Sequence, residues 1–292
     1  MKNDRKRLFI KINKDNLPKV KDKYPFIYLE RGRLEIDDSS VKWIDSEGNL
    51  IRLPVATLNT ILLGPGTSVT HEAVKVLAAA NCTVSWVGED SMLFYAVGQS
   101  PTNDSRNLRL QMDLATNVKK RTEVARRLFS YRFPDSDVQG KNLSQLMGME
   151  GRRVKALYAE KAETYGVGWK GRSYVPGKFE IGDVTNQMLT SLNAALYGMM
   201  TSAIYSMGYS PRIGFIHSGS PLPFVYDMSD LYKDDLCIDL AFKLTLEMAG
   251  EYNRHAVADA FRTRVIQDEI MGQVSKDIDY ILRGSDGRRT GK

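Results

Sequence analysis

The chain has little cysteine and no long apolar run, and each scarcity excludes a class of protein. Of its 292 residues only Cys82 and Cys237 are cysteines, and they lie far apart in segments with buried character. We therefore expect reduced core thiols, and neither a disulfide nor a zinc cluster. No apolar run reaches the roughly 18 residues of a membrane span. The basic start, with Arg5, Lys6 and Arg7, is not followed by the apolar core of a secretory signal, so we expect a cytoplasmic location without membrane association.

Several common catalytic patterns are also absent. Gly64-Pro65-Gly66 lacks the lysine of a phosphate-binding loop and is typical of a turn, and no ordered Ser, His and Asp triad appears. The chain has 3 histidines. His71 begins a predicted helix and His255 lies among charged residues typical of a solvated face, so we assign neither a role.

Positive charge is in excess. Lysine and arginine total 41 against 35 acidic residues, which gives a net charge of +6 and a pI near 9.1. This favours a polyanionic partner, but many basic proteins bind no nucleic acid, and any single basic pair is more often a solvated helix face. The basic residues recur in clusters at 5–7, 119–121, 126–127, 152–155 and 170–172. Such clusters could follow a phosphate backbone, so charge alone leaves a nucleic-acid partner open.

The first part of the chain predicts a small β-sheet or sandwich domain over residues 1–97. Short strand-like segments alternate with turn signals, and Thr70 is placed to cap one short helix over 71–80. The expected strands are 26–29, 34–36, 41–44, 50–53, 58–63, 83–87 and 92–97. Residues 98–104 have the composition of a linker.

Beyond the linker the hydrophobic period changes from two to about 3.6, which predicts an all-α second domain over residues 105–283. The expected helices are 105–132, 143–165, 184–207, 222–232, 235–250, 253–272 and 275–283. The fold class is therefore α+β. Residues 284–292 are small, polar and basic, which predicts a flexible tail with weak affinity for DNA.

Glu150 interrupts an apolar stripe on the expected helix 143–165. The other positions on that side are apolar or aromatic: 143, 146, 147, 154, 157 and 158. An ionised carboxylate there is costly unless a positive group meets it. Gly148 and Gly151 flank it and would let another segment come close. Two interpretations stay open: a buried ion pair with an arginine, or a metal ligand.

His217, Asp227 and Asp230 form a second group of candidates. His217 ends an apolar segment, where a lone histidine is more often a satisfied core residue. The spacing of Asp227 and Asp230 places both on one helical face, where acids alone are usually cap and dipole residues. Imidazole and carboxylate together, however, suit Mg²⁺ or Mn²⁺ in phosphate chemistry. Joined by Glu150, they are a candidate metal centre.

These residues lie in segments that resemble a known family. Gly148–Val154, Gly214–Gly219 and Phe224–Asp230 resemble the three metal motifs of the CRISPR-associated Cas1 adaptation integrases. The sheet domain of that family, specifically of its subtype I-E branch, is similar to three segments of the first domain: Tyr28–Glu35, Leu63–His71 and Val84–Glu89. The similarity extends to about residue 270.

The resemblance implies a catalytic helical domain that inserts DNA. In the family, a homodimer joins a dimer of the small Cas2 protein, binds a double-stranded prespacer and integrates it at the leader end of the CRISPR array. Each prespacer 3′-hydroxyl attacks a phosphodiester at a repeat boundary. A metal-dependent nuclease acting on branched or double-stranded DNA is one alternative, and a non-catalytic DNA-binding scaffold is another.

The resemblance also assigns residues. It implies Glu150, His217 and Asp230 as ligands of Mg²⁺ or Mn²⁺, with Asp227 as a further catalytic acid that binds a second ion or shapes the site. The candidates for DNA contact are Arg31, Arg33, Arg152, Arg153, Lys155, Arg172 and Lys233. Ser220 departs from the family, because many relatives carry a lysine or arginine there. Either Lys233 or Arg212 replaces that cation, or integration is weaker.

Overall fold

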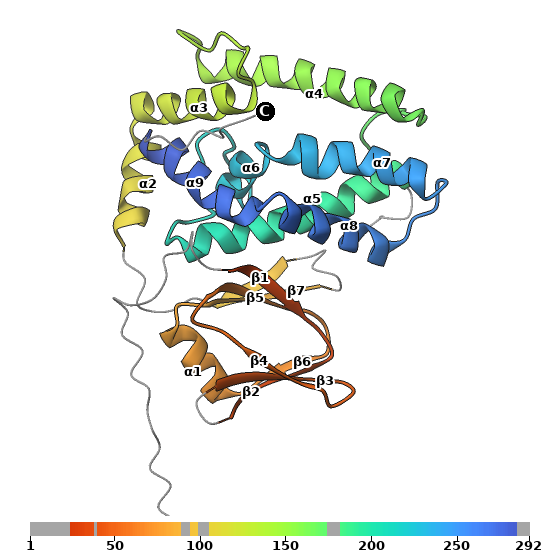
Figure 1. Ribbon diagram of the computed structural model, residues 1–292. Coiled ribbons are helices and arrows are strands. Elements are labelled where there is room, and N and C mark those ends of the chain that lie inside the picture. The colour runs from red at the N-terminus through yellow and green to blue at the C-terminus, as the bar shows by residue number, and fades with distance from the viewer. Residues whose placement is uncertain (1–23, 38–39, 89–93, 99–104, 174–181, 285–292) are drawn as a thin grey trace, which may run out of the picture.

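A sheet domain and a helical domain make up the part of the chain that the structure describes. The computed structural model describes residues 24–37, 40–88, 94–98, 105–173 and 182–284. The sheets lie below the helices in Figure 1, which confirms the predicted α+β class. Most of the expected linker and tail, residues 99–104 and 285–292, lies outside the described residues. Across the described ranges, no helix has both the length and the apolar character to cross a membrane.

The sheet domain consists of two four-stranded sheets packed face to face. One sheet has the order β1 (Tyr24–Leu29), β5 (Leu58–Leu63), β7 (Thr83–Val87) and β8 (Phe94–Gly98). Its first three strands are parallel, and β8 is antiparallel to β7. The other sheet has the order β4 (Leu50–Leu53), β3 (Ser40–Asp45), β2 (Gly32–Asp37) and β6 (Thr67–Val69). Side chains of both sheets, including Leu34, Trp43 and Ile61, form one buried core.

The one helix in the described residues of this domain, α1 (His71–Ala79), begins where its cap signal predicts. The Thr70 side chain accepts a hydrogen bond from the backbone of Ala73, and Ala73 and Leu77 are buried against the sheets. Strand β6 was not predicted. Its three residues are too few to show a period of two, and it forms because it pairs in parallel with β2.

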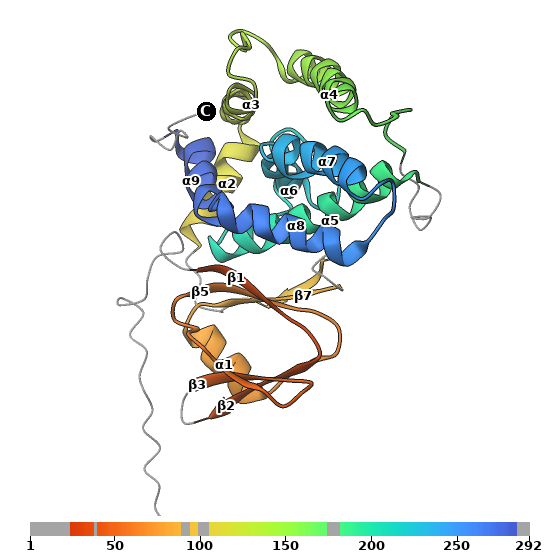
Figure 2. The ribbon, with the colours of Figure 1, turned by 45° about the vertical axis from the view of Figure 1, so that its right-hand side comes forward.

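The helical domain is built around α5 (Val184–Ser206), most of whose side chains are buried. The elements around it are α2 (Arg106–Thr116), α3 (Val118–Arg132), α4 (Leu143–Tyr165), α6 (Pro223–Ser229), a π-helical segment η5 (Asp234–Asp239), α7 (Leu240–Glu247), α8 (Arg254–Gln267) and α9 (Ile270–Arg283). Figures 1 and 2 show α3 and α4 on the side of this domain farthest from the sheets.

Several helix boundaries were wrongly predicted, including the break between the expected helices 253–272 and 275–283, which falls between α8 and α9 at residues 268–269. The expected helix 105–132 is two helices, α2 and α3, because Asn117 has an extended backbone at φ −88° and ψ 115°. Its side chain accepts a hydrogen bond from the backbone of Lys120 at 3.1 Å and so caps α3. The expected helix 235–250 likewise consists of the π-helical segment followed by the shorter α7.

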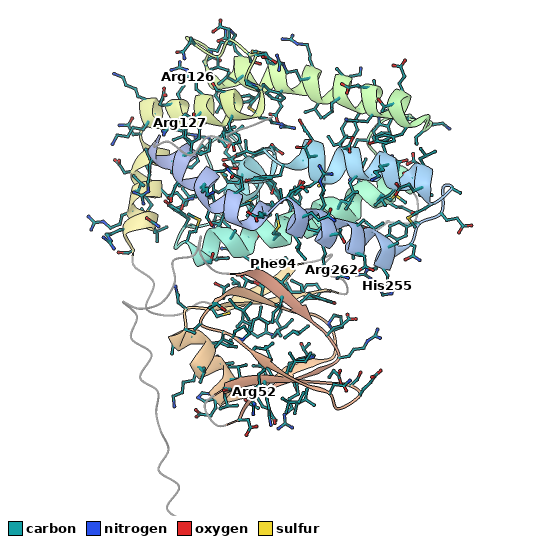
Figure 3. All side chains as sticks on the ribbon, viewed as in Figure 1. Arg52, Phe94, Arg126, Arg127, His255 and Arg262 are labelled. Atoms are coloured by element: carbon teal, nitrogen blue, oxygen red, sulfur yellow. The ribbon has the colours of Figure 1, made fainter. Side chains whose placement is uncertain are left out.

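The two domains share a buried contact. Helix α5 packs on strands β5, β7 and β8, and Ser85 of β7 is hydrogen-bonded to Ser202 of α5 at 2.8 Å between their hydroxyl oxygens. Arg262, on the side of α8 facing the sheets in Figure 3, places its guanidinium 5.6 Å from the ring centre of Tyr28. The helical domain therefore rests on the sheet domain through both polar and aromatic contacts.

Candidate active site

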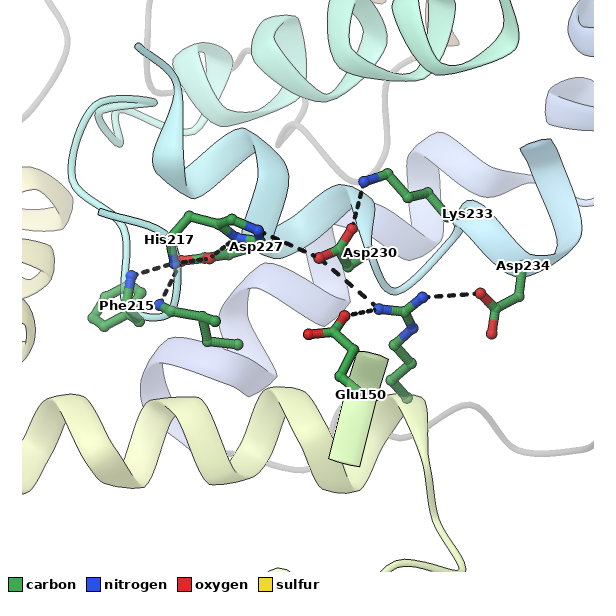
Figure 4. A network of polar contacts seen from close by, with 9 residues as sticks. Glu150, Phe215, His217, Asp227, Asp230, Lys233 and Asp234 are labelled. Carbon is green, nitrogen blue, oxygen red and sulfur yellow. Dashed lines mark hydrogen bonds and ion pairs between the residues drawn. The ribbon is translucent and has the colours of Figure 1, made fainter. Parts of the chain in front are cut away.

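The predicted site residues come together from three separate parts of the helical domain. Glu150 lies on α4, His217 in the loop between α5 and α6, Asp227 on α6, and Asp230 is the C-cap of α6. Figure 4 shows their side chains gathered in one polar network. Sequence reasoning therefore selected residues that the fold brings together.

Asp227 organises the loop that carries His217. Its side chain is fully buried, and its carboxylate accepts backbone N–H groups of Phe215 at 2.6 Å, Ile216 at 3.2 Å and His217 at 2.9 Å. It also meets Nδ1 of the His217 ring at 2.8 Å. A single carboxylate thus accepts the backbone N–H groups of the loop and also orients the imidazole of His217. Asp227 therefore shapes the site.

The bond to Asp227 also determines the chemistry of His217. In the neutral ring, Nδ1 donates to the carboxylate, so Nε2 remains the acceptor and lies 3.9 Å from Oδ2 of Asp230. A histidine whose Nδ1–H is held by a carboxylate is the usual arrangement of a metal-binding imidazole. The Asp227 hydrogen bond, against the effect of burial, raises the pKa of His217 above its ordinary value.

Asp230 lies between two cations. Oδ1 is 2.6 Å from Nζ of Lys233, and Oδ2 is 3.9 Å from Nη1 of Arg132. Lys233 also lies 5.2 Å from the ring centre of Tyr197. Burial disfavours the charged ammonium, but the Asp230 carboxylate and the Tyr197 hydroxyl outweigh it and raise the pKa of Lys233.

Glu150 forms the ion pair that sequence reasoning left open. Its partner is Arg132, the last residue of α3, which contacts Oε1 of Glu150 and reaches Oδ1 of Asp234 at 3.0 Å. The Arg132 side chain is only 6% exposed, so this guanidinium is a buried hub of three carboxylates. Burial and the neighbouring Asp230 raise the pKa of Glu150, while Arg132 opposes that rise.

The surroundings of Glu150 differ from the expected apolar stripe. Only Leu146 of that face is fully buried, and Met147 is 46% exposed. A Cβ added at Gly148 or Gly151 would have no neighbour within 4 Å, so the expected close approach of another segment is wrong. The reason is that α4 packs at the edge of the domain.

The donor set fits a divalent ion in kind. Two carboxylates and an imidazole with an accepting Nε2 are ligands of Mg²⁺ and Mn²⁺. In the arrangement that the described residues adopt, no three His, Cys, Asp or Glu side chains lie close enough together to hold an ion. Arg132 contacts both Glu150 and Asp230, so a shared ion would require this guanidinium to move.

Two further residues support the His217 loop and were not predicted. Gln111 of α2 is fully buried, donates to the carbonyls of Ser210 at 2.8 Å and Ile213 at 2.7 Å, and accepts the N–H of Ser210 at 2.8 Å. Arg121 of α3 donates from Nε to the carbonyl of Phe215 at 2.7 Å. Gln111 carries a weak sequence signal, because it is a polar side chain close to the apolar positions Leu110 and Leu114.

The candidates for DNA contact fall into three groups. Arg152, Arg153 and Lys155 are exposed on α4, the helix of Glu150. Arg31 and Arg33 are exposed in the sheet domain, where Arg33 contacts Glu35. Arg172 and Lys233 are engaged within the chain, Arg172 with Asn186 at 2.9 Å and Thr190 at 2.9 Å, and Lys233 with Asp230.

Neither Lys233 nor Arg212 stands out as the replacement for the cation expected at position 220. The Ser220 hydroxyl is buried without a hydrogen-bond partner among the described residues. Lys233 is bound to Asp230, whereas Arg212 is exposed in the loop that leads to His217. Figure 3 shows that other basic residues, such as Arg126 and Arg127 of α3 and Arg52 of β4, are spread over both domains.

Comparison with known proteins gives consistent matches. The family model for CRISPR associated protein Cas1 matches residues 26–138 and 134–255. The CRISPR-associated endonuclease Cas1 2 of Chlorobaculum tepidum is 63% identical over 276 residues, covering 94% of this chain and 93% of that protein. The CRISPR-associated endonuclease Cas1 of Escherichia coli K12 is 38% identical over 247 residues, 84% of this chain and 81% of that protein.

Solved structures share the fold. The crystal structure of the TtCas1–DNA complex is 37% identical in sequence and superposes with a TM-score of 0.78, covering 92% of this chain and 100% of that chain. A casposase bound to its integration product covers 90% of this chain and 92% of that chain with a TM-score of 0.64. At 16% identity the casposase shows likeness of fold alone.

Proposed function

The chain belongs to the CRISPR-associated Cas1 family of endonucleases and integrases, and from that premise we propose that it integrates prespacer DNA into a CRISPR array. The convergence of Glu150, His217 and Asp230 from separate segments carries this proposal. Each prespacer 3′-hydroxyl attacks a phosphodiester at a repeat boundary, and the leaving 3′-oxygen takes a proton, so one phosphodiester replaces another and no ATP is required.

Glu150, His217 and Asp230 would hold one Mg²⁺ or Mn²⁺. Such an ion, when bound, lowers the pKa of an attacking hydroxyl and neutralises charge on the phosphoryl oxygens. Asp227 keeps the His217 ring oriented so that Nε2 is turned toward Asp230. Lys233 supplies fixed positive charge beside the Asp230 carboxylate, in a buried setting where such charge acts strongly. Arg132 would move aside from Glu150 and Asp230 to admit the ion.

Arg152, Arg153 and Lys155 would hold the DNA backbone. They are exposed on the helix that carries Glu150, so phosphates bound there would lie against that helix. Phosphate contacts fix register without reading sequence. The TtCas1 relative has a structure in complex with DNA, which supports a DNA partner for this chain.

The assembly is proposed from the family resemblance. The chain would form a homodimer, join a Cas2 dimer and act in the cytoplasm, and its sheet-domain motifs favour the subtype I-E branch. Genes for the other subtype I-E proteins beside this one, with a repeat array, would support that assignment, and genes of another subtype would contradict it.

The proposed function is tested with Glu150→Ala. Wild-type protein with Cas2, Mn²⁺ and a labelled prespacer should join the label to supercoiled DNA bearing a leader and repeat, and Glu150→Ala should lose this activity. Glu160→Ala, on the same helix with its side chain 66% exposed, is the matched control and should retain it. Equal joining by Glu150→Ala and Glu160→Ala, with both folded, would refute the proposed centre.

A nuclease is the second candidate, because the relatives from Chlorobaculum tepidum and Escherichia coli are called endonucleases. Nicking and strand transfer use the same displacement at phosphorus and differ in the nucleophile, water or a DNA hydroxyl. A single reaction with labelled prespacer and plasmid separates them, since joined products indicate transfer and cut products alone indicate hydrolysis. A non-catalytic scaffold would give neither product and no Mn²⁺ binding dependent on Glu150 and His217.

A further inference from the structure

Asp277 is a buried carboxylate that the proposed chemistry does not use. It lies on α9 and is 0% exposed. Its Oδ1 accepts hydrogen bonds from the Tyr131 hydroxyl at 2.6 Å and from Nε2 of Gln273 at 2.6 Å. Its Oδ2 accepts a hydrogen bond from the Tyr232 hydroxyl. Because a buried carboxylate is costly without donors, this arrangement is a strong constraint on all four side chains.

Both tyrosines directly precede a cation of the candidate centre. Tyr131 precedes Arg132 at the end of α3, and Tyr232 precedes Lys233 between α6 and the π-helical segment. Arg132 and Lys233 are the two cations that contact Asp230, at 3.9 Å and 2.6 Å. One carboxylate on α9 therefore connects the two segments that bring positive charge to Asp230.

Each oxygen of Asp277 serves a different segment. Oδ1 holds the tyrosine of α3, and Oδ2 holds the tyrosine that follows α6. The Tyr131 ring also packs against Tyr280 of α9, with ring centres 5.8 Å apart. These contacts fix the end of α3 relative to the segment that carries Lys233. They therefore also fix the position of Arg132, the last residue of α3, beside Asp230.

We propose that Asp277 is a positioning residue of the active centre, which sets the placement of Arg132 and Lys233 around Asp230 through the hydroxyls of Tyr131 and Tyr232. This inference rests on the proposed function for its kinetic consequences. A purely structural network would contribute stability alone, whereas a positioning network also determines how fast the bound DNA reacts.

Tyr131→Phe, Tyr232→Phe and the double variant test the proposal, because each removes a hydroxyl and keeps the packed ring. The matched control is Tyr252→Phe, which removes a hydroxyl that contacts Ser191 at 2.7 Å in another part of the helical domain. All variants should melt slightly below the wild type. The double variant should lose about 10- to 100-fold in the single-turnover strand-transfer rate, with unchanged DNA affinity, whereas Tyr252→Phe should keep the wild-type rate.

The possible results separate this inference from the proposed function. An active wild type with equal rates in the double variant and Tyr252→Phe would overturn the positioning role and leave the proposed function intact. A wild type without joining or cleavage would overturn the proposed function. In that case a crystal structure of the double variant decides the positioning role: displacement of Arg132 or Lys233 from Asp230 supports it, and unchanged distances of 3.9 Å and 2.6 Å to Asp230 overturn it.

Discussion

Asp227 and His217 are joined twice through the same oxygen. Oδ1 of Asp227 accepts the backbone N–H of His217 at 2.9 Å and meets the ring Nδ1 at 2.8 Å. The backbone and the ring of this histidine are therefore fixed by one atom of a carboxylate. A change at Asp227 must consequently alter both the loop and the imidazole.

Asp227→Asn should destabilise the protein by about 2 kcal/mol. The amide replaces one accepting oxygen with an NH₂ group, which would face buried N–H donors of Phe215, Ile216 or His217. Denaturant unfolding measures the change. Asp137→Asn is the control, because Asp137 is 76% exposed and should change stability little; equal effects at the two sites would contradict the shaping role of Asp227.

Gln111→Leu should lower the free energy of unfolding by about 2 kcal/mol, because it leaves the N–H of Ser210 and two carbonyls of the loop without their side-chain partner. Hydrogen exchange of residues 210–217 should become faster while α5 keeps its protection. Gln139→Leu, at an exposed position, is the control. Unchanged exchange in the loop would show that Gln111 does not hold it.

Both thiols should be unreactive in the folded protein. Cys82 and Cys237 are free and buried, and burial raises the pKa of Cys237 to about 12. At pH 8 such a thiol has almost no thiolate, which is the reactive form. A colorimetric thiol reagent should detect no fast-reacting group in native protein and 2 after denaturation. Rapid labelling of native Cys237 would contradict the buried environment.

The three exposed basic residues of α4 should account for part of the salt dependence of DNA binding. Replacing Arg152, Arg153 or Lys155 with glutamine should reduce the slope of log K against log salt by about 0.9 for each DNA phosphate that the variant no longer neutralises. Fluorescence anisotropy with a labelled duplex gives the slope at several salt concentrations. Lys276→Gln, an exposed position on α9, should leave it unchanged. Equal slopes for the wild type and a variant that carries all three glutamine substitutions would show that these residues do not contact the DNA.

Local signals in the sequence predicted much of the fold. The bounds of β4, β5, β7 and α4 agree with those expected, because period, turn residues and caps act over a few neighbouring residues. Asn117 shows the limit of this reasoning. It lies in a continuous helical pattern, and its capping geometry, rather than any glycine or proline, ends α2.

The partners of the site residues could not be predicted in the same way. Glu150 was identified by its place on an apolar face, but Arg132 lies 18 positions earlier, at the end of another helix. Nothing in the local pattern around Arg132 or Asp234 indicates that they meet Glu150. Asp277 is likewise buried because tyrosines from two distant segments reach it, and that is a property of the folded chain.

The peripheral position of α4 has a consequence for the energetics of binding. Its one fully buried side chain is Leu146, whereas α5 buries most of its length, so local unfolding of α4 exposes less apolar surface and costs less free energy. Glu150 therefore lies on a helix whose local unfolding costs less than that of α5, whereas the Asp227 side chain is fully buried and that of Asp230 is 14% exposed. Any ligand that requires Glu150 in place must populate the folded form of α4, and its binding free energy then adds to the stability of that helix.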